Sequence, residues 1–369
     1  MDTAERISHL NVSDPGLLAL LALWQDEKPS GLCIHDVRVP YDQFKSALVR
    51  HQVIVELAPV LSQLDEVYSV NEYKDLSALV EQEVIRQMRL AREMLSILSL
   101  YEKEGIKVVP FKGPALSHEL YGEYVRKTSS DLDLLVSPDQ LMQAERLLFQ
   151  KGYTSKKYEF NHFNRLYWSF FKRFNYHGAY FNANEGILIE LHWKFFATAD
   201  AFPKKHRQVI RDSLNQERKG EHYVKLVKED LIVYLAMHGT VHLWIRLKWI
   251  LDIRGFMLKH GDGTDWQLVK EACERANLSR AVTLALRLSH VFFNTTVPAQ
   301  FEWNSQDRHL NELWNIALDS LQGEFNPASR TQYNRVMRVV KGNAYSTAIY
   351  KLQDYGHDLI NRLSGSRSE

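Results

Sequence analysis

The sequence predicts an α+β fold in which a small mixed sheet with its own helices is flanked by N-terminal and C-terminal helical regions. Apolar residues recur at helical spacing before about residue 105 and after about residue 200, whereas short β-branched runs occupy the stretch between. We therefore expect a helical region at 1–105, a catalytic core at 106–200, a helical domain at 201–363 and a disordered tail at 364–369. For 369 residues, two or three folding units are the usual outcome.

The N-terminal region carries two apolar stretches at helical spacing, separated by loops near Pro29 and Pro40. The first stretch contains Leu17, Leu18, Leu20, Leu21 and Trp24. The second contains Val80, Ile85, Met88, Leu90, Met94 and Ile97. Helical spacing returns in the C-terminal part, over residues 231–256 and 280–293.

The middle of the chain is expected to form the sheet. Its predicted strands cover residues 107–111, 131–136, 173–181 and 187–193. A helix is expected over 114–121. A second one should start after a Ser137 cap, with Pro138 at its first position and Gln140 three residues past the cap, and should run to about Lys151, where Gly152 ends it.

Charge and cysteine content exclude several classes of protein. Lys and Arg number 46 against 45 Asp and Glu, so no global cationic field exists for binding a long nucleic acid. Cys33 and Cys273 stand alone, which predicts neither a disulfide framework nor a cysteine zinc site and suits a reduced compartment. The first ten residues lack a signal-peptide pattern, and no apolar run approaches the ~20 residues of a membrane helix. We expect a cytoplasmic protein without membrane contact.

Asp131 and Asp133 are the most informative residues. In a strand, alternate side chains share a face, so both carboxylates project together while Leu132 and Leu134 point the other way. Two adjacent carboxylates repel each other unless a cation lies between them, and oxygen ligands favour Mg2+ or Mn2+. The alternative is a strand edge with two solvated acids.

Glu190 supplies a third carboxylate. Ile187, Ile189 and Leu191 alternate with Glu190 and His192, so this acid again faces away from an apolar side. If its strand lies beside that of Asp131 and Asp133, the three acids form the cluster that two-metal catalysis requires. The two aspartates would bridge the ions. Glu190 would serve the ion on the nucleophile side and take its proton.

Lys112 and Gly113 follow the first predicted strand and precede a helix. A glycine that permits close approach, a helix N-terminus and a lysine together suit a phosphate. An ordinary strand-to-helix turn is the alternative.

These stretches carry a family resemblance. Residues 111–116, Tyr121-Gly122, Arg126 and residues 130–136 resemble the signature of the uncharacterised nucleotidyltransferase family within the polymerase-β-like superfamily, and residues 190–193 resemble its third-acid strand. A looser likeness runs through His51, residues 238–244 and residues 246–253. The wider superfamily has Gly-Ser where this sequence has Lys112-Gly113.

The resemblance implies a polymerase-β-like nucleotidyltransferase core that transfers a nucleoside monophosphate from a nucleoside triphosphate, expected to be ATP, to a hydroxyl-type acceptor and releases pyrophosphate. It implies catalytic and metal-binding roles for Asp131, Asp133 and Glu190, and nucleotide-binding roles for Ser130 and His192 within the matching motifs. A small-molecule acceptor is the first expectation. A protein side chain that receives AMP is a second possibility, and a non-catalytic nucleotide-binding module is a third.

Several further residues are candidates for binding nucleotide or acceptor. His238 and His242 have a spacing that suits zinc, but Gly239 replaces the glutamate of the zinc-protease pattern. With Arg246 and Lys248, the two histidines either line the cleft or pack a buried helix. Arg126 either clamps phosphate or pairs with acids. An aromatic cluster at 160–176 either stacks a base or packs the core.

Overall fold

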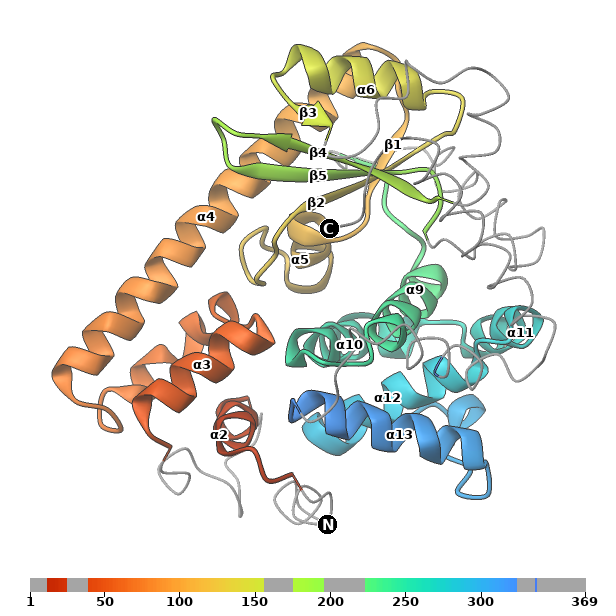
Figure 1. Cartoon of the computed structure of the whole chain (residues 1–369). Coiled ribbons are helices and arrows are strands. Elements are labelled where there is room, and N and C mark those ends of the chain that lie inside the picture. Colours follow the sequence, from red (N-terminus) through yellow and green to blue (C-terminus); the bar gives the residue numbers. More distant parts are fainter. Residues whose placement is uncertain (1–11, 25–38, 156–174, 196–222, 324–335, 337–369) are drawn as a thin grey trace, which may run out of the picture. The chain divides into compact units, whose positions relative to one another are not determined.

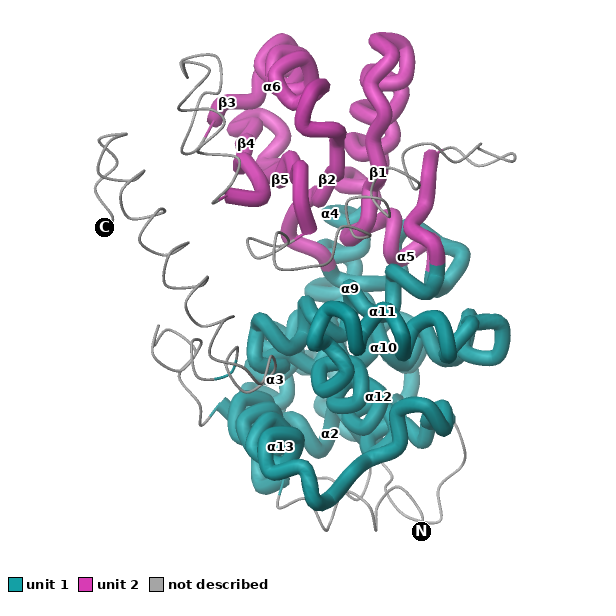
Figure 2. The backbone as a smooth tube through the Cα atoms, turned by 90° about the vertical axis from the view of Figure 1, so that its right-hand side faces the viewer, with its two compact units in different colours: residues 1–87, 120–128, 228–342 teal, residues 88–119, 129–227, 343–369 magenta. Residues whose placement is uncertain are grey.

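The computed structural model describes residues 12–24, 39–155, 175–195, 223–323 and Val336. The chain divides into two compact units (Figure 2). Unit 1 comprises residues 1–87, 120–128 and 228–342, and unit 2 comprises residues 88–119, 129–227 and 343–369. Each unit is thus assembled from separate segments of the chain, and the domain boundaries expected from the sequence stay a prediction.

Unit 2 contains a five-stranded mixed sheet with the order β1-β2-β5-β4-β3 (Figure 1). The strands are β1 (Val108–Pro110), β2 (Leu132–Val136), β3 (Thr154–Ser155), β4 (His177–Asn182) and β5 (Ile187–His192). β2 and β5 run parallel, and all other neighbours are antiparallel. The prediction of a small mixed sheet with many helices is confirmed.

Helix α6 (Leu141–Gln150) packs against one face of this sheet. Tyr180 of β4 donates a hydrogen bond to buried Glu145 of α6 (2.9 Å), and its ring lies 6.0 Å from that of Phe149. Tyr101, near the end of helix α4 (Val70–Lys103), donates to the carbonyl of Ala144 (3.1 Å). Side chains alternate between the two faces of a strand, so the residues on either side of Tyr180 in β4 point to the face of the sheet opposite α6.

The predicted start of α6 is wrong. Pro138, Asp139 and Gln140 form a turn, and no side chain caps the helix, which begins at Leu141. The Gln140 side chain instead accepts from the amide of Lys107 and donates to the carbonyl of Gly105. The predicted end is confirmed, because Gly152 adopts φ +84° directly after the helix.

Helices make up the described part of unit 1. They are α2 (Pro15–Leu23), α3 (Tyr41–His51), η1 (Val55–Leu64), the first half of α4, α9 (Lys228–Val241), α10 (Leu247–His260), η4 (Gly261–Gly263), α11 (Trp266–Ala276), α12 (Ser279–Phe293), η5 (Ala299–Phe301) and α13 (Arg308–Leu321). Helix α5 (Gly113–Tyr121) follows β1, as the sequence predicted.

The helical pattern over 231–256 is divided between α9 and α10. Leu243 and Trp244 both adopt a positive φ (56° and 55°), which ends one helix and turns the chain into the next. The buried ring of Trp244 lies against Gly239 of α9, where a Cβ atom would overlap it. The apolar periodicity over 231–256 is continuous in the sequence, so it does not reveal the break between the two helices, which depends on how Trp244 packs.

Several predictions concern residues outside the described part of the chain. These are the loop near Pro29, the tail at 364–369 and the aromatic cluster apart from Tyr176. Among the helices that are described, none combines the length and the apolar character needed to cross a bilayer. Cys273 of α11 is buried with a free thiol.

Candidate functional site

The parallel pairing of β2 and β5 places Asp133 directly beside Glu190. Asp133 is the register partner of Glu190, with Leu132 opposite Ile189 and Leu134 opposite Leu191. The two carboxylates therefore lie on one face, and the leucines and isoleucines lie on the other. The two acid-bearing strands are thus neighbours, which is the arrangement that a cluster of these acids requires.

Asp131 comes just before β2, next to the turn that starts α5. Ser130 donates a hydrogen bond to the Asp131 carboxylate (3.1 Å). Gly113 has φ +59°, and a Cβ atom there would lie 3.1 Å from the carbonyl oxygen of Asp131. The turn thus requires glycine for its backbone conformation and for this close approach.

Lys112 contacts the acid cluster. Its Nζ lies 2.5 Å from Asp133 Oδ1, and the side chains are 19% and 1% exposed. The backbone amide of Phe111 donates to the carbonyl of Asp133 (3.3 Å), which aligns the end of β1 with β2. The predicted phosphate-binding lysine therefore reaches the carboxylates directly.

His192 lies between two of the acids. Its Nε2 is 3.1 Å from Asp133 Oδ1 and 3.2 Å from Glu190 Oε2, and its Nδ1 is 3.3 Å from the carbonyl of Lys194. The imidazole is almost fully buried. Oδ2 of Asp133 is also buried, and it has no hydrogen-bond partner within the described residues.

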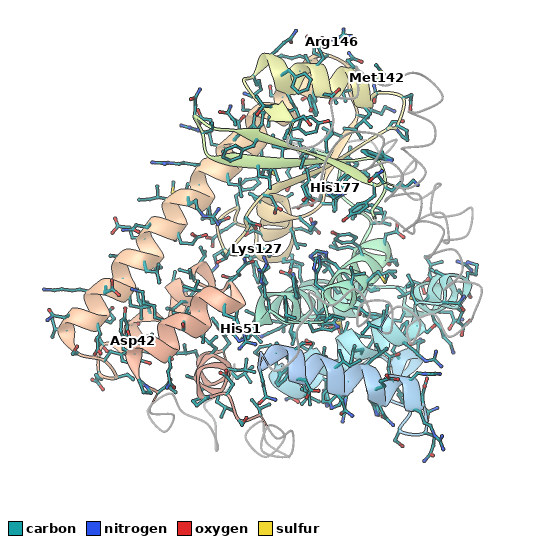
Figure 3. All side chains as sticks on the ribbon, viewed as in Figure 1. Asp42, His51, Lys127, Met142, Arg146 and His177 are labelled. Carbon is teal, nitrogen blue, oxygen red and sulfur yellow. The ribbon has the colours of Figure 1, made fainter. Side chains whose placement is uncertain are left out.

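His177 completes the cluster and was not singled out from the sequence. It pairs in register with His192 across β4 and β5, and its Nε2 lies 3.6 Å from Glu190 Oε1. Figure 3 labels it at the start of β4. His177 falls inside the predicted strand 173–181, but only the register of the hairpin reveals that it faces Glu190.

The carboxylates have different proton affinities. Burial, reinforced by the charge of Asp133, raises the pKa of Asp131 to about 6. Burial also acts to raise the pKa of Asp133, but Lys112 and His192 outweigh it and hold this pKa well below its usual range. In Glu190, burial is likewise outweighed, chiefly by the hydrogen bond from His192, and the pKa is lowered.

The two histidines differ as well. Burial acts to lower the pKa of His192, yet its hydrogen bonds to Asp133 and Glu190 dominate and the pKa is raised. Burial and the nearby His192 lower the pKa of His177 to about 4, so His177 is neutral near pH 7.

Comparison with protein families matches residues 39–294 to the family described as uncharacterised nucleotidyltransferase. The chain belongs to this family. Searches of curated proteins and of solved structures give no significant match. Membership of this nucleotidyltransferase family supports transfer of a nucleotidyl group from a nucleoside triphosphate.

The nucleotidyltransferase match includes the remaining candidate residues, which belong to unit 1. His238 stacks on Tyr234 of α9 (5.8 Å between ring centroids, 17° between planes), and His242 stacks on Trp249 of α10 (5.0 Å, 24°). The Arg246 guanidinium lies 5.8 Å from the Trp249 ring. These ring contacts agree with the alternative in which the two histidines pack a helix. A nucleotide-binding role for the three residues stays a prediction.

Lys248 and Arg126 also lie in unit 1. Lys248 is buried and donates to the side chain of Gln52, directly after α3. Arg126 lies close enough to Tyr121 to act on its hydroxyl electrostatically. Roles for Lys248 and Arg126 in binding phosphate stay predictions.

Proposed function

We propose that this chain is a metal-dependent enzyme that transfers a nucleoside monophosphate from a nucleoside triphosphate to a hydroxyl-type acceptor and releases pyrophosphate. One observation carries the proposal: Asp133 and Glu190 are register partners on the parallel strands β2 and β5. Asp131 comes directly before β2, and the charges of both acids act on its carboxylate. The polymerase-β-like core that the family resemblance implies is part of this proposal.

The acid cluster fits divalent metal. It offers hard carboxylate oxygens, and one of them, Oδ2 of Asp133, is buried without a partner in the described part of the chain. Bound divalent ions would activate the acceptor hydroxyl and neutralise charge on the triphosphate. Asp131 and Asp133 would hold the ions together, and Glu190 would hold the ion on the acceptor side. We take Mg2+ or Mn2+ as the cofactor.

In the transfer step, the acceptor oxygen forms a bond to the α-phosphorus while the bond to the bridging oxygen breaks and pyrophosphate leaves. Glu190, ionised near neutral pH because its pKa is lowered, takes the hydroxyl proton. Holding both reactants in line is the main contribution of the protein.

Lys112 and the turn at Gly113 bind the triphosphate in this proposal. The Lys112 ammonium group, which pairs with Asp133, would exchange this contact for phosphate oxygens of the bound nucleotide. Helix α5 begins at Gly113, so the positive end of its dipole would also favour an anion bound beside Lys112.

We further propose ATP as the nucleotide, a small molecule as the acceptor and the cytoplasm as the location. The formal net charge of +1 supports an acceptor other than a long nucleic acid. A protein hydroxyl would use the same acids.

The test incubates the protein with α-labelled ATP, GTP, CTP or UTP and either Mg2+ or Mn2+, in metabolite extract and separately in protein lysate. Pyrophosphate release and a labelled, mass-shifted product are measured. We expect metal-dependent product from one extract, with a loss of at least about 100-fold in Asp131→Ala/Asp133→Ala.

The control is Asp262→Asn, which removes one exposed carboxylate in η4 and should retain wild-type turnover. Tight binding of metal and nucleotide with no product in any extract would refute the transferase and favour a non-catalytic nucleotide-binding module. Product on a protein band instead of a metabolite would identify a protein acceptor.

A further inference from the structure

We propose that the Glu190 side of the acid cluster is a mixed nitrogen–oxygen metal site, formed by His177, Glu190 and His192, which selects a first-row transition-metal dication over Mg2+. The inference rests on the proposed function insofar as that function places metal at these acids. The inference goes beyond that function in the choice of ion, because a site made of carboxylates alone would favour Mg2+.

The geometry of three side chains supports this site. His177, Glu190 and His192 each offer a ligand atom, and these atoms lie within 4.8 Å of one another. Nε2 of His177 is 3.6 Å from one Glu190 oxygen, and Nε2 of His192 is 3.2 Å from the other. One ion bound here would take two imidazole nitrogens and a carboxylate oxygen as its ligands.

The second nitrogen of His192 has the partner that metal-binding histidines usually have. Nδ1 lies 3.3 Å from the carbonyl of Lys194, to which a protonated Nδ1 donates. Nε2, which faces Glu190 and Asp133, would release its proton to bind an ion and would then offer its lone pair. A backbone acceptor that orients the ring in this way is typical of imidazole ligands to metal.

Asp133 provides an independent indication of a position that suits a cation. The residue is 2% exposed, and its Oδ2 has no hydrogen-bond partner among the residues described. A buried carboxylate oxygen without a donor is costly. Because Oδ1 of the same group contacts both Lys112 and His192, the free oxygen is available to a neighbouring ion.

Ligand chemistry decides which ion binds. Mg2+ requires near-octahedral oxygen coordination and keeps its waters, whereas imidazole favours transition metals. Two imidazoles and one carboxylate therefore select a transition ion at the Glu190 side. Asp131 contributes oxygen only, so the triphosphate side remains suited to Mg2+.

The test uses the full-length protein, freed of metal by a chelator and titrated with Mn2+ alone. Electron paramagnetic resonance measures free Mn2+, and pulsed measurements detect nitrogen bound to it. We expect nitrogen couplings in the wild type that change when histidine is labelled with 15N. In His177→Gln, Mn2+ affinity should fall about tenfold or more, whereas Mg2+ affinity, measured by Mg2+ binding in the absence of Mn2+, should change little.

His309→Gln, an exposed residue at the start of α13, is the control and should behave like the wild type. Mn2+ bound without nitrogen couplings, or no Mn2+ binding at all, would overturn the inference. Both of these results are measured on the wild-type protein, so they do not depend on whether a variant folds. Metal-dependent transfer that persists with such an oxygen-only site would leave the proposed function standing, so the two failures are distinguishable.

Discussion

At the level of single residues, Asp131 and Asp133 have opposite electrostatic surroundings although only Leu132 separates them. The Asp133 carboxylate contacts Lys112 and His192, whereas the described hydrogen bond of the Asp131 carboxylate comes from Ser130. Ionisation of Asp131 is therefore less favourable in the folded protein than in water, as its pKa of about 6 indicates. Metal binding would remove this cost.

The first prediction concerns the stability of Asp131→Asn in the presence of a chelator. The folded-state pKa is raised from 3.8 to about 6, so the ionised carboxylate lowers the free energy of unfolding above pH 6 and has no effect well below pH 3.8. We expect the variant to be more stable than wild type by about 1–2 kcal/mol near pH 7, with the gain vanishing as the pH falls. Urea unfolding at several pH values measures it.

Asp133→Asn is the opposing comparison. The folded-state pKa of Asp133 is lowered, so its charge stabilises the fold at neutral pH, and this stabilisation is lost on acidification. The variant should be less stable than wild type near pH 7. If both substitutions changed the free energy of unfolding equally at every pH, the opposite pKa shifts of Asp131 and Asp133 would be contradicted.

The second prediction concerns Gly113→Ala. Alanine at φ +59° is strained, and its Cβ atom would lie 3.1 Å from the Asp131 carbonyl oxygen. Gly186→Ala is the matched control, because φ is +66° there and no atom lies within 4 Å. Both should lose about 1 kcal/mol of stability from backbone strain, and only Gly113→Ala should also lose transfer activity. Similar activity in both variants would show that the close approach has no role.

At the level of elements, the loop before β2 is anchored to helices of unit 1 by buried polar contacts. Lys127 forms an ion pair with Asp252 of α10 (3.2 Å), with both side chains less than a tenth exposed. The backbone amide and hydroxyl of Thr128 donate to Glu56 of η1 (3.0 and 2.8 Å). The route of this loop is therefore fixed by partners far away in sequence.

The third prediction tests this anchor. Lys127→Met removes the buried ammonium group that lies 3.2 Å from Asp252 and should cost about 3–5 kcal/mol of unfolding free energy. Lys45→Met, which removes an exposed pair with Asp75, is the control and should cost less than about 1 kcal/mol. The double variant Lys127→Met/Asp252→Leu should recover most of the loss. Additive losses in the double variant would argue against a direct coupling of the two charges.

The elements also show which features a sequence can reveal. Alternation in 131–136 and 187–193 predicts strands and the shared face of their acids, because the period of a strand is local. Register is not local, so His177 was missed and its position opposite His192 was found only in the structure. The cap at Ser137 failed for the same reason, since Gln140 bonds to Gly105 and Lys107 on another segment.

At the level of the whole molecule, each compact unit draws on separate stretches of the chain. Unit 2 includes the second half of α4, whose Met94, Ile97 and Tyr101 are buried. Tyr101 also bonds to Ala144 of α6. The segment 106–200, which the sequence predicted as the core domain, lacks this helix.

The fourth prediction compares two fragments of the chain. Residues 88–227 retain the half-helix that covers α6, and residues 106–227 do not. The longer fragment should keep more protected amides in β2 and β5, because loss of several buried apolar side chains removes about 1.5–3 kcal/mol each. Hydrogen exchange measures this difference. Equal protection in both fragments would show that α4 is dispensable for the sheet.

The parallel pairing of β2 with β5 also has a consequence for biosynthesis. Asp133 and His192 are 59 residues apart along the chain, and parallel strands require a long crossover between them. During translation, Asp131 and Asp133 leave the ribosome well before Glu190 and His192 do. A nascent chain therefore lacks the complete cluster until β5 has emerged and paired. If the cluster binds metal as proposed, metal affinity would report the completion of this late step, and partly folded molecules would fail to retain the ion.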